Sequence, residues 1–168
     1  CETLRLSGMY TTSRFVAPSH SRDNTADYEK FDPLWGTEAD VRSLCAEAAK
    51  YGIRVVLDGV FSHTGSDSRY FNRENRYPTL GAYNSKASPY YPWYTFSEYP
   101  DKYKSWWGFE TLPEVNEESP AYLDFLTGKD GIVRRWLRAG AAGWRLRAPV
   151  ELPAAFLGAL ARSANTEK

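Results

Sequence analysis

One stretch of the sequence decides how the chain is interpreted: Ile53-Arg54-Val55-Val56-Leu57-Asp58-Gly59-Val60-Phe61-Ser62-His63-Thr64-Gly65. An apolar run ends on the carboxylate of Asp58, and the imidazole of His63 follows on a loop that closes with a glycine. A short apolar run of this kind predicts a buried strand. Parallel α/β proteins place polar chemistry at the carboxyl ends of such strands. Taken alone, the same residues also fit a buried strand with a solvent-facing Asp and His, so the rest of the chain must decide.

The bulk composition limits the classes of function. The chain has 168 residues, with 21 Lys and Arg against 21 Asp and Glu. This length suits one domain, and the balanced charge gives no reason to expect nucleic acid or an anionic membrane as a partner. No apolar run could span a bilayer and the N-terminus lacks a signal-peptide pattern, so we expect a cytoplasmic protein. Two cysteines form no disulfide framework, and we expect Cys45 to be a reduced, buried thiol.

Around the opening stretch, the pattern predicts alternating helices and strands. Thr37 and Asp40 resemble a capping box that begins a helix running to about Tyr51. A strand at 53–58 follows directly, which is the helix-to-strand step of a βαβ unit. The apolar stripe of the helix is predicted to contain Val41, Leu44, Cys45, Ala48 and Ala49. The other predicted elements are a strand entering a loop within 9–15, helices at 120–126, 132–138 and 153–161, and a strand at 144–148.

The composition of residues 64–117 predicts a long irregular segment that interrupts this alternation of helices and strands; we call it the excursion. Aromatic residues make up 15% of the chain, with six Trp and twelve Tyr, and many of them gather in this Pro-, Gly- and Ser-rich segment. A loop of this length inside a compact domain is usually either functional or a mistaken assignment of elements. We therefore expect a single α/β domain over residues 1–168 that carries an aromatic-rich excursion at 64–117.

Three motifs, in this order, resemble the α-amylase family of glycoside hydrolases. The first motif most resembles that of the neopullulanase, cyclomaltodextrinase and maltogenic-amylase branch; its sequence is Asp58-Gly59-Val60-Phe61-Ser62-His63-Thr64-Gly65. Leu112-Pro113-Glu114-Val115-Asn116 resembles the motif that closes the domain-B-like loop after the third barrel strand. Gly143-Trp144-Arg145-Leu146 resembles the start of the fourth-strand motif. The resemblance covers most of residues 10–160.

The resemblance implies a (β/α)₈ barrel of which this chain holds a part. A full barrel takes about 250 residues, and only the second, third and fourth strands have counterparts here. We therefore expect a partial TIM barrel carrying a domain-B-like loop. The implied ligand is an α-glucan or maltooligosaccharide. The family also implies a salt bridge between Asp58 and Arg145, and a hydrogen bond from His63 to a sugar at the reacting subsite. A satisfied loop histidine is the alternative for His63.

Arg147 departs from the family at the position where the resemblance places the nucleophilic aspartate. Retaining glycosidases need two carboxyl groups, one to attack carbon and one to protonate the leaving oxygen, and a guanidinium does neither. The family's general acid and stabilising aspartate belong to later strands. We therefore assign no catalytic residue and expect the chain to be a fragment or degenerate member whose catalysis is impaired. Glu114 and Glu151 are weak candidates for a replacement nucleophile, because both are expected to be solvated carboxylates.

Aromatic side chains of the excursion are the best remaining ligand candidates. Sugar rings stack their C–H faces on Trp and Tyr, which favours Trp106 and Trp107, with Trp93 and Tyr94 as further candidates. The alternative is that these rings form a small core of their own. Near the second strand, the family's substrate-stacking Tyr position is Asp23, and His20 is expected at the surface. We expect no cofactor; the resemblance allows calcium, but no Asp/Asn cluster specifies it.

Three hypotheses remain at this point. The leading one is a catalytically impaired partial barrel of the α-amylase family. The alternative is a non-catalytic α-glucan-binding or assembly module that uses the aromatic excursion, and the third is a redesigned or fragmentary chain without natural activity. In each case the edges of an unclosed barrel would lack partners, so we also expect self-association through them.

Overall fold

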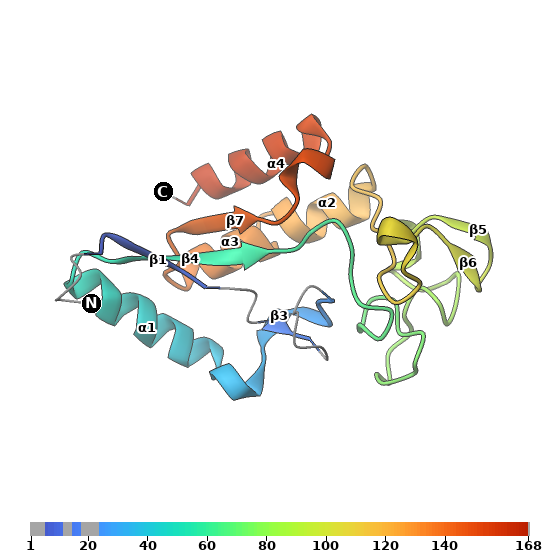
Figure 1. Cartoon of the computed structure of the whole chain (residues 1–168), viewed down its shortest axis with the longest axis horizontal. Coiled ribbons are helices and arrows are strands. Elements are labelled where there is room, and N and C mark those ends of the chain that lie inside the picture. Colours follow the sequence, from blue (N-terminus) through green and yellow to red (C-terminus); the bar gives the residue numbers. More distant parts are fainter. Residues whose placement is uncertain (1–5, 12–14, 18–23, 168) are drawn as a thin grey trace.

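Figure 1 shows a computed structural model of the chain, which describes residues 6–11, 15–17 and 24–167. The predictions for His20 and Asp23 lie outside these residues. At its centre is a three-stranded parallel sheet in the order β1 (Gly8–Tyr10), β4 (Arg54–Gly59) and β7 (Gly143–Leu146). The register pairs Tyr10 with Val56 and Asp58 with Arg145. Because the strands are parallel, their carboxyl ends meet at one edge of the sheet.

Helix α1 (Glu38–Lys50) begins with the predicted capping box. The Thr37 backbone N–H donates to the Asp40 carboxylate at 2.7 Å, and the Asp40 N–H donates to the Thr37 hydroxyl at 3.4 Å. The buried positions are Val41, Cys45 and Ala48, while Leu44 and Ala49 are exposed, so the predicted stripe is too wide. The helix lies along one side of a narrow sheet (Figure 1), which leaves the flanking positions in solvent. Cys45 is a free, buried thiol as predicted, and burial raises its pKa.

The remaining helices are α2 (Pro120–Thr127), α3 (Ile132–Arg138) and α4 (Ala154–Asn165). In Figure 1, α4 lies above the strands and α1 below them. Helix α4 continues past the predicted end at Ala161, whereas β7 stops short of Ala148. Ala148 has a left-handed backbone, φ 46°, which ends the extended conformation there. None of the described helices is long and apolar enough to cross a bilayer.

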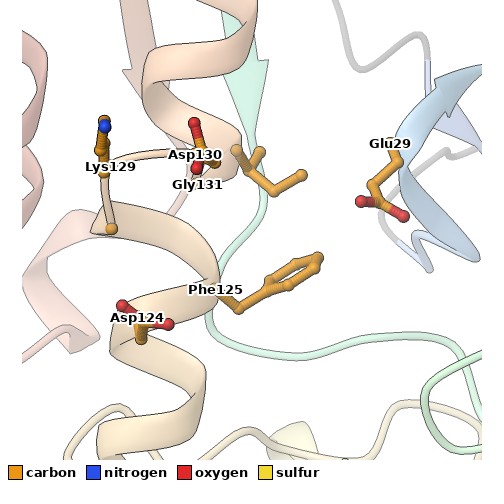
Figure 2. A pocket seen from close by; sticks show the side chains of 8 residues that line it. Glu29, Asp124, Phe125, Lys129, Asp130 and Gly131 are labelled. Carbon is orange, nitrogen blue, oxygen red and sulfur yellow. The ribbon is translucent and has the colours of Figure 1, made fainter.

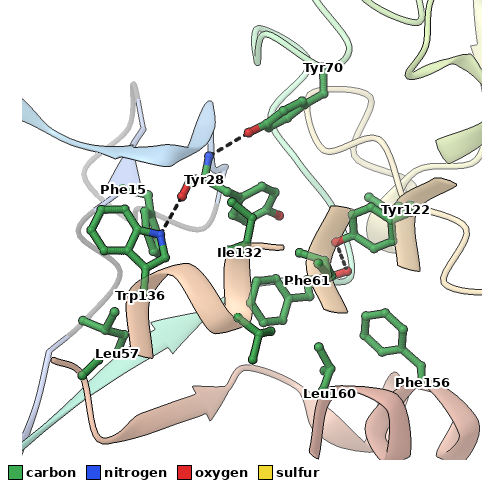
Figure 3. Packing of buried hydrophobic residues seen from close by; sticks show 14 of the residues in the cluster. Phe15, Tyr28, Leu57, Phe61, Tyr70, Tyr122, Ile132, Trp136, Phe156 and Leu160 are labelled. Atoms are coloured by element: carbon green, nitrogen blue, oxygen red, sulfur yellow. Dashed lines mark hydrogen bonds between the residues drawn. The ribbon is translucent and has the colours of Figure 1, made fainter. Parts of the chain in front are cut away.

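The core joins these elements to a small hairpin of β2 (Phe15–Val16) and β3 (Asp27–Phe31), which are antiparallel. In Figure 3, the Trp136 indole N–H of α3 donates to the Tyr28 carbonyl at 3.0 Å. The Tyr28 N–H donates to the Tyr70 hydroxyl at 2.9 Å, and the Tyr122 hydroxyl donates to the Phe61 carbonyl at 2.8 Å. All five residues are fully buried. The aromatic side chains of the core therefore also form hydrogen bonds with backbone groups that have no partner in a β-ladder.

The excursion at 64–117 contains few regular elements: η3 (Tyr91–Trp93), β5 (Phe96–Glu98), β6 (Lys102–Tyr103) and η4 (Trp106–Gly108). Its interior is aromatic, with Phe71 in ring contact with Tyr94 at 4.9 Å and Tyr103 at 4.6 Å. Trp93 and Tyr94 are only 2% and 6% exposed. These two candidates are therefore core rings that cannot stack on sugar: Tyr94 packs on Phe71 inside the excursion, and Trp93 packs between the excursion and α2.

Candidate functional site

The carboxyl ends of β4 and β7 carry a buried ion pair. The Asp58 side chain has no exposed surface, and the Arg145 Nε and Nη2 donate to its two oxygens at 2.5 and 2.9 Å. The predicted salt bridge is confirmed. Such a two-pronged contact is the strong form of an arginine–carboxylate pair. The hydrogen bond to Asp58 also raises the pKa of Arg145.

Tyr10 completes this cluster from the end of β1. The Arg145 guanidinium lies over its ring, 4.4 Å from the centroid, which is a cation–π contact. The sequence analysis did not select Tyr10. The available signal was its place at the end of the first strand, because the ends of neighbouring parallel strands converge.

Arg147 lies immediately beyond β7, with its backbone N–H donating to the Gly59 carbonyl at 3.0 Å. Its Nη1 is 3.5 Å from the Asp58 Oδ2, and its side chain is 44% exposed. Asp58 therefore faces two guanidinium groups. At position 147, where the resemblance implies a nucleophile, the chain has a guanidinium that pairs with Asp58 of the neighbouring strand β4.

His63 follows Asp58 on the loop and is 2% exposed. Its Nδ1 is 2.8 Å from the Ser62 hydroxyl. The Leu112–Asn116 motif lies beside it, because the Val115 N–H donates to the Ser62 carbonyl at 2.9 Å and the Thr64 N–H to the Pro113 carbonyl at 3.1 Å. The first motif therefore contacts both of the others, the second through these hydrogen bonds and the third through the pair of Asp58 and Arg145.

Trp106 and Trp107 form a stacked pair, with ring centroids 4.5 Å apart and planes at 10°. Trp106 also stacks on His63 at 4.7 Å. Both indole N–H groups donate to the Glu151 carboxylate, at 2.8 Å from Trp106 and 3.1 Å from Trp107. Trp107 is 72% exposed. The structure therefore connects both predicted tryptophans to His63, and adds Glu151, whose contact no local spacing in the sequence indicates.

Glu114 differs from the expected solvated carboxylate. Its side chain is 22% exposed and lies 2.7 Å from the Lys104 ammonium. This ion pair raises the pKa of Lys104. An amine that holds the carboxylate in this way leaves it poorly placed to attack a sugar carbon.

No three His, Cys, Asp or Glu side chains within residues 6–11, 15–17 and 24–167 are grouped so that they could hold a metal ion. Carboxylates are the usual anchors of a calcium site. The described residues therefore give no carboxylate set that fits calcium.

A separate pocket of about 330 Å³ lies between β3 and the turn from α2 to α3 (Figure 2). Glu29 lines one side, and Asp124, Lys129 and Asp130 line the other. Glu29 is already paired with Arg69 at 3.1 Å. None of the lining residues belongs to the predicted site, so this pocket and the strand-end cluster are distinct features.

Comparison with known proteins agrees with the motifs. The family described as alpha amylase, catalytic domain, matches residues 2–155. The chain belongs to the α-amylase family. It is 36% identical to an amylopullulanase of Thermoanaerobacterium saccharolyticum over 98% of its own length and 14% of that protein. It is 30% identical to neopullulanase 2 of Thermoactinomyces vulgaris over 92% of its length and 26% of that protein.

Solved structures confirm the predicted fold. The debranching enzyme of Nostoc punctiforme superposes with a TM-score of 0.85 at 27% identity, covering 99% of this chain and 36% of that one. This α-amylase-family chain is thus part of a (β/α)₈ barrel, and it spans a minor share of the relatives it matches. The comparison does not test the assignment of Asp58, His63, Arg145, Trp106 and Trp107 to glucan binding, which stays a prediction.

Proposed function

We propose that this chain is an α-glucan-directed member of its family that does not hydrolyse glucan by itself. One observation carries the proposal: Arg147 lies at the end of β7, where the family resemblance places the nucleophile, and pairs with Asp58 at 3.5 Å. The relatives have names that point to α-glucans, among them amylopullulanase and neopullulanase, so the proposed ligand class is α-glucan or maltooligosaccharide.

The chemistry supports impaired catalysis. Two carboxyl groups about 5–5.5 Å apart are needed for the retaining reaction. Asp58 is held by Arg145 through both of its oxygens, and a carboxylate in that state is a poor nucleophile. A guanidinium at position 147 stays cationic, so it can neither attack carbon nor give up a proton, and it opposes the positive charge that develops on the sugar.

Incubation of the purified 168-residue chain with starch, pullulan and cyclodextrin tests this proposal. The expected result is no release of reducing sugar above a buffer control. Turnover that co-purifies with the chain would contradict it, whether or not that turnover persists in Asp58→Ala.

The substitution Arg147→Asp probes the same site from the other direction. It restores the family's residue but supplies no general acid, and groups that act as a unit do not contribute additively. We therefore expect no hydrolysis from this variant. Activity in Arg147→Asp that is lost again in Arg147→Asp/Glu151→Gln or Arg147→Asp/Glu114→Gln would identify an unexpected acid.

A second candidate function is non-catalytic binding of α-glucan, which is favoured by the exposed Trp107 ring on its stack with Trp106. Binding needs no catalytic carboxylate, because ground-state contacts lower the binding free energy without lowering the chemical barrier. Arg145, whose side chain is 37% exposed, would supply contacts to sugar hydroxyls, while the buried Asp58 and His63 would hold Arg145 and Trp106 in place. Titration with maltoheptaose, followed by tryptophan fluorescence, should give a saturable change. A flat titration, or an unchanged response in Trp106→Ala/Trp107→Ala, would reject this candidate.

Self-association through the sheet edges is part of the proposal. In the part of the chain that the structure describes, β1 and β7 each pair with β4 alone. Beside β7 lies a mostly apolar cavity of about 200 Å³, lined by residues that include Trp144, Leu146 and Leu157. The β7 edge of one copy could pair in parallel with the β1 edge of another. Sedimentation velocity should show species larger than a monomer, and a compact monomer at all concentrations would contradict it.

The proposed location is the cytoplasm. An intracellular maltogenic amylase of Bacillus subtilis is 29% identical over 99% of this chain and 27% of its own length. Fractionation of the source cells with an antibody to this chain tests the location, and recovery from the culture medium would reject it.

A further inference from the structure

The tryptophan pair has an unusual backbone. Trp106 and Trp107 are neighbours in sequence, yet their rings stack almost parallel. Trp107 reaches this position with φ 52° and ψ 26°, in the left-handed region, and Gly108 follows at φ 80°. Bulky side chains rarely adopt this conformation, and strained residues persist only when their surroundings hold them. Some contact must therefore hold Trp107 in place.

The Glu151 carboxylate makes that contact. One oxygen accepts from the Trp106 Nε1 at 2.8 Å and the other from the Trp107 Nε1 at 3.1 Å. An indole N–H can only donate, so a carboxylate with two acceptor oxygens is a fitting partner for two indoles at once. Glu151 ends η5 (Pro149–Glu151), the turn that follows β7. The bridge thus ties the end of the excursion to the carboxyl end of the sheet.

The stack leaves a single ring face open to solvent. Trp106 lies between His63, at 4.7 Å, and Trp107, at 4.5 Å. His63 is buried and Trp107 is 72% exposed. The outer face of Trp107 is therefore a flat apolar surface at the end of a stack that starts at His63, on the loop that follows Asp58. A glucosyl ring presents the C–H face that stacks on such a surface.

We propose that Glu151 is a positioning residue for α-glucan binding: its carboxylate holds Trp106 and Trp107 in one stacked arrangement that presents the outer face of Trp107 to a glucosyl ring. This inference rests on the proposed glucan-binding function and adds a residue to it. Glu151 does not itself touch the sugar. Its effect on affinity comes from ordering the two indoles before the sugar arrives, so that binding does not have to order them.

Two variants of the full chain test the inference against a matched control. Glu151→Ala removes both acceptors, and Glu151→Gln keeps one oxygen and replaces the other with an amide group that cannot accept. Glu98→Gln changes an exposed carboxylate of the same excursion that pairs with the Lys102 ammonium at 2.9 Å instead of with an indole. Circular dichroism reports the exciton coupling of the stacked indoles, and calorimetry reports the affinity for maltoheptaose.

We expect Glu151→Ala to lose the exciton signal and to bind maltoheptaose about tenfold more weakly, the loss expected when two side chains must be ordered on binding. Glu151→Gln should fall between it and the wild type, and Glu98→Gln should match the wild type in both measurements. The double variant Glu151→Ala/Trp107→Ala should bind no more weakly than Trp107→Ala, because Glu151 acts through that ring.

The outcomes separate the inference from the function on which it rests. A wild-type chain that gives no saturable heat with maltoheptaose rejects the proposed glucan binding and, with it, the role of Glu151 in affinity. A wild-type chain that binds, together with a Glu151→Ala variant of equal affinity or intact exciton signal, rejects the inference alone.

Discussion

The parallel sheet and the excursion at 64–117 satisfy their backbone groups in different ways. The sheet does so with ladders between β4 and its two neighbours, over buried aliphatic residues such as Val55 and Leu57. The excursion has little ladder and uses side chains instead. The Asn72 amide donates to the carbonyls of Tyr77 at 3.0 Å and Thr79 at 3.1 Å. Buried backbone groups need hydrogen-bond partners. A sheet supplies them through its backbone ladder, whatever the side chains are, whereas an irregular segment depends on particular side chains.

The largest predicted effect breaks the attachment of the excursion to the barrel segment. Trp93 is buried against Tyr122 and Phe125 of α2, at ring distances of 5.0 and 4.8 Å. Trp93→Ala should lower the free energy of unfolding by about 3–5 kcal/mol, the usual cost of a large aromatic cavity. The control is Phe109→Ala, an exposed aromatic residue of the same excursion, which should change it by about 0.5 kcal/mol or less. Equal effects in urea denaturation would mean that the excursion is not docked on α2.

A smaller effect is expected from the ion pair at the strand ends. Asp58→Asn removes the charge that balances Arg145 and Arg147 while keeping the size of the side chain. Removing one partner of a buried ion pair costs about 3 kcal/mol, because the other charge is left unpaired. Both arginines are partly exposed, so the loss of stability should be at or below that value. The exposed pair of Glu47 and Lys50 is the control, and Glu47→Gln should cost about 0.5 kcal/mol or less. Thermal denaturation that ranks the two variants equally would contradict this.

The third prediction isolates the side-chain hydrogen bonds of the excursion. Asn72 and Asn75 both have a left-handed backbone, φ 57° and 55°, but Asn72 is buried and Asn75 is exposed. Asn72→Ala should cost about 2 kcal/mol, because the Tyr77 and Thr79 carbonyls lose the donor that the buried Asn72 amide supplies and Ala disfavours this backbone. Asn75→Ala should cost about 1 kcal/mol or less, since it loses the backbone preference and one exposed hydrogen bond, which the Asn84 amide donates at 3.3 Å. If both variants have the same denaturation midpoint, the amide bonds of Asn72 contribute nothing.

The smallest effect is a pH dependence of stability, and it concerns Glu38 in the regular part of the molecule, at the start of α1. Hydrogen bonds from Arg135 and then Arg42 hold the pKa of Glu38 below its usual value. A depressed folded pKa gives stability that is present above the unfolded value of about 4.3 and is lost as pH falls through the folded value. Glu38→Gln should therefore be less stable than the wild type at neutral pH, by about 0.5 kcal/mol. The two melting temperatures should converge below that window, and a gap that stays constant with pH would show that charge is not the cause.

Local signals predicted the helices and the strands of the parallel sheet, but not the hairpin of β2 and β3. The capping box at Thr37 and Asp40 and the C-terminal Gly52 bracket α1 closely, because the interactions involved span a single helical turn. The apolar run predicted β4, and the resemblance predicted the Asp58–Arg145 pair. The width of the buried stripe on α1 was wrong, since Leu44 faces solvent. How much of a helix is covered depends on its neighbours, and no local window contains them.

The sequence by itself determined the family, the order of the elements and the charge change at Arg147, because motifs and periodicity are written in consecutive residues. Only the tertiary structure decided which aromatic rings are core and which are surface: Trp93 is buried and Trp107 is exposed, although both lie in the same excursion. It also decided that Glu151 joins Trp106 and Trp107, from which it is separated by 45 and 44 positions in the sequence. Contacts of this range depend on how the sheet and the excursion pack together, so they appear only when the whole chain is folded.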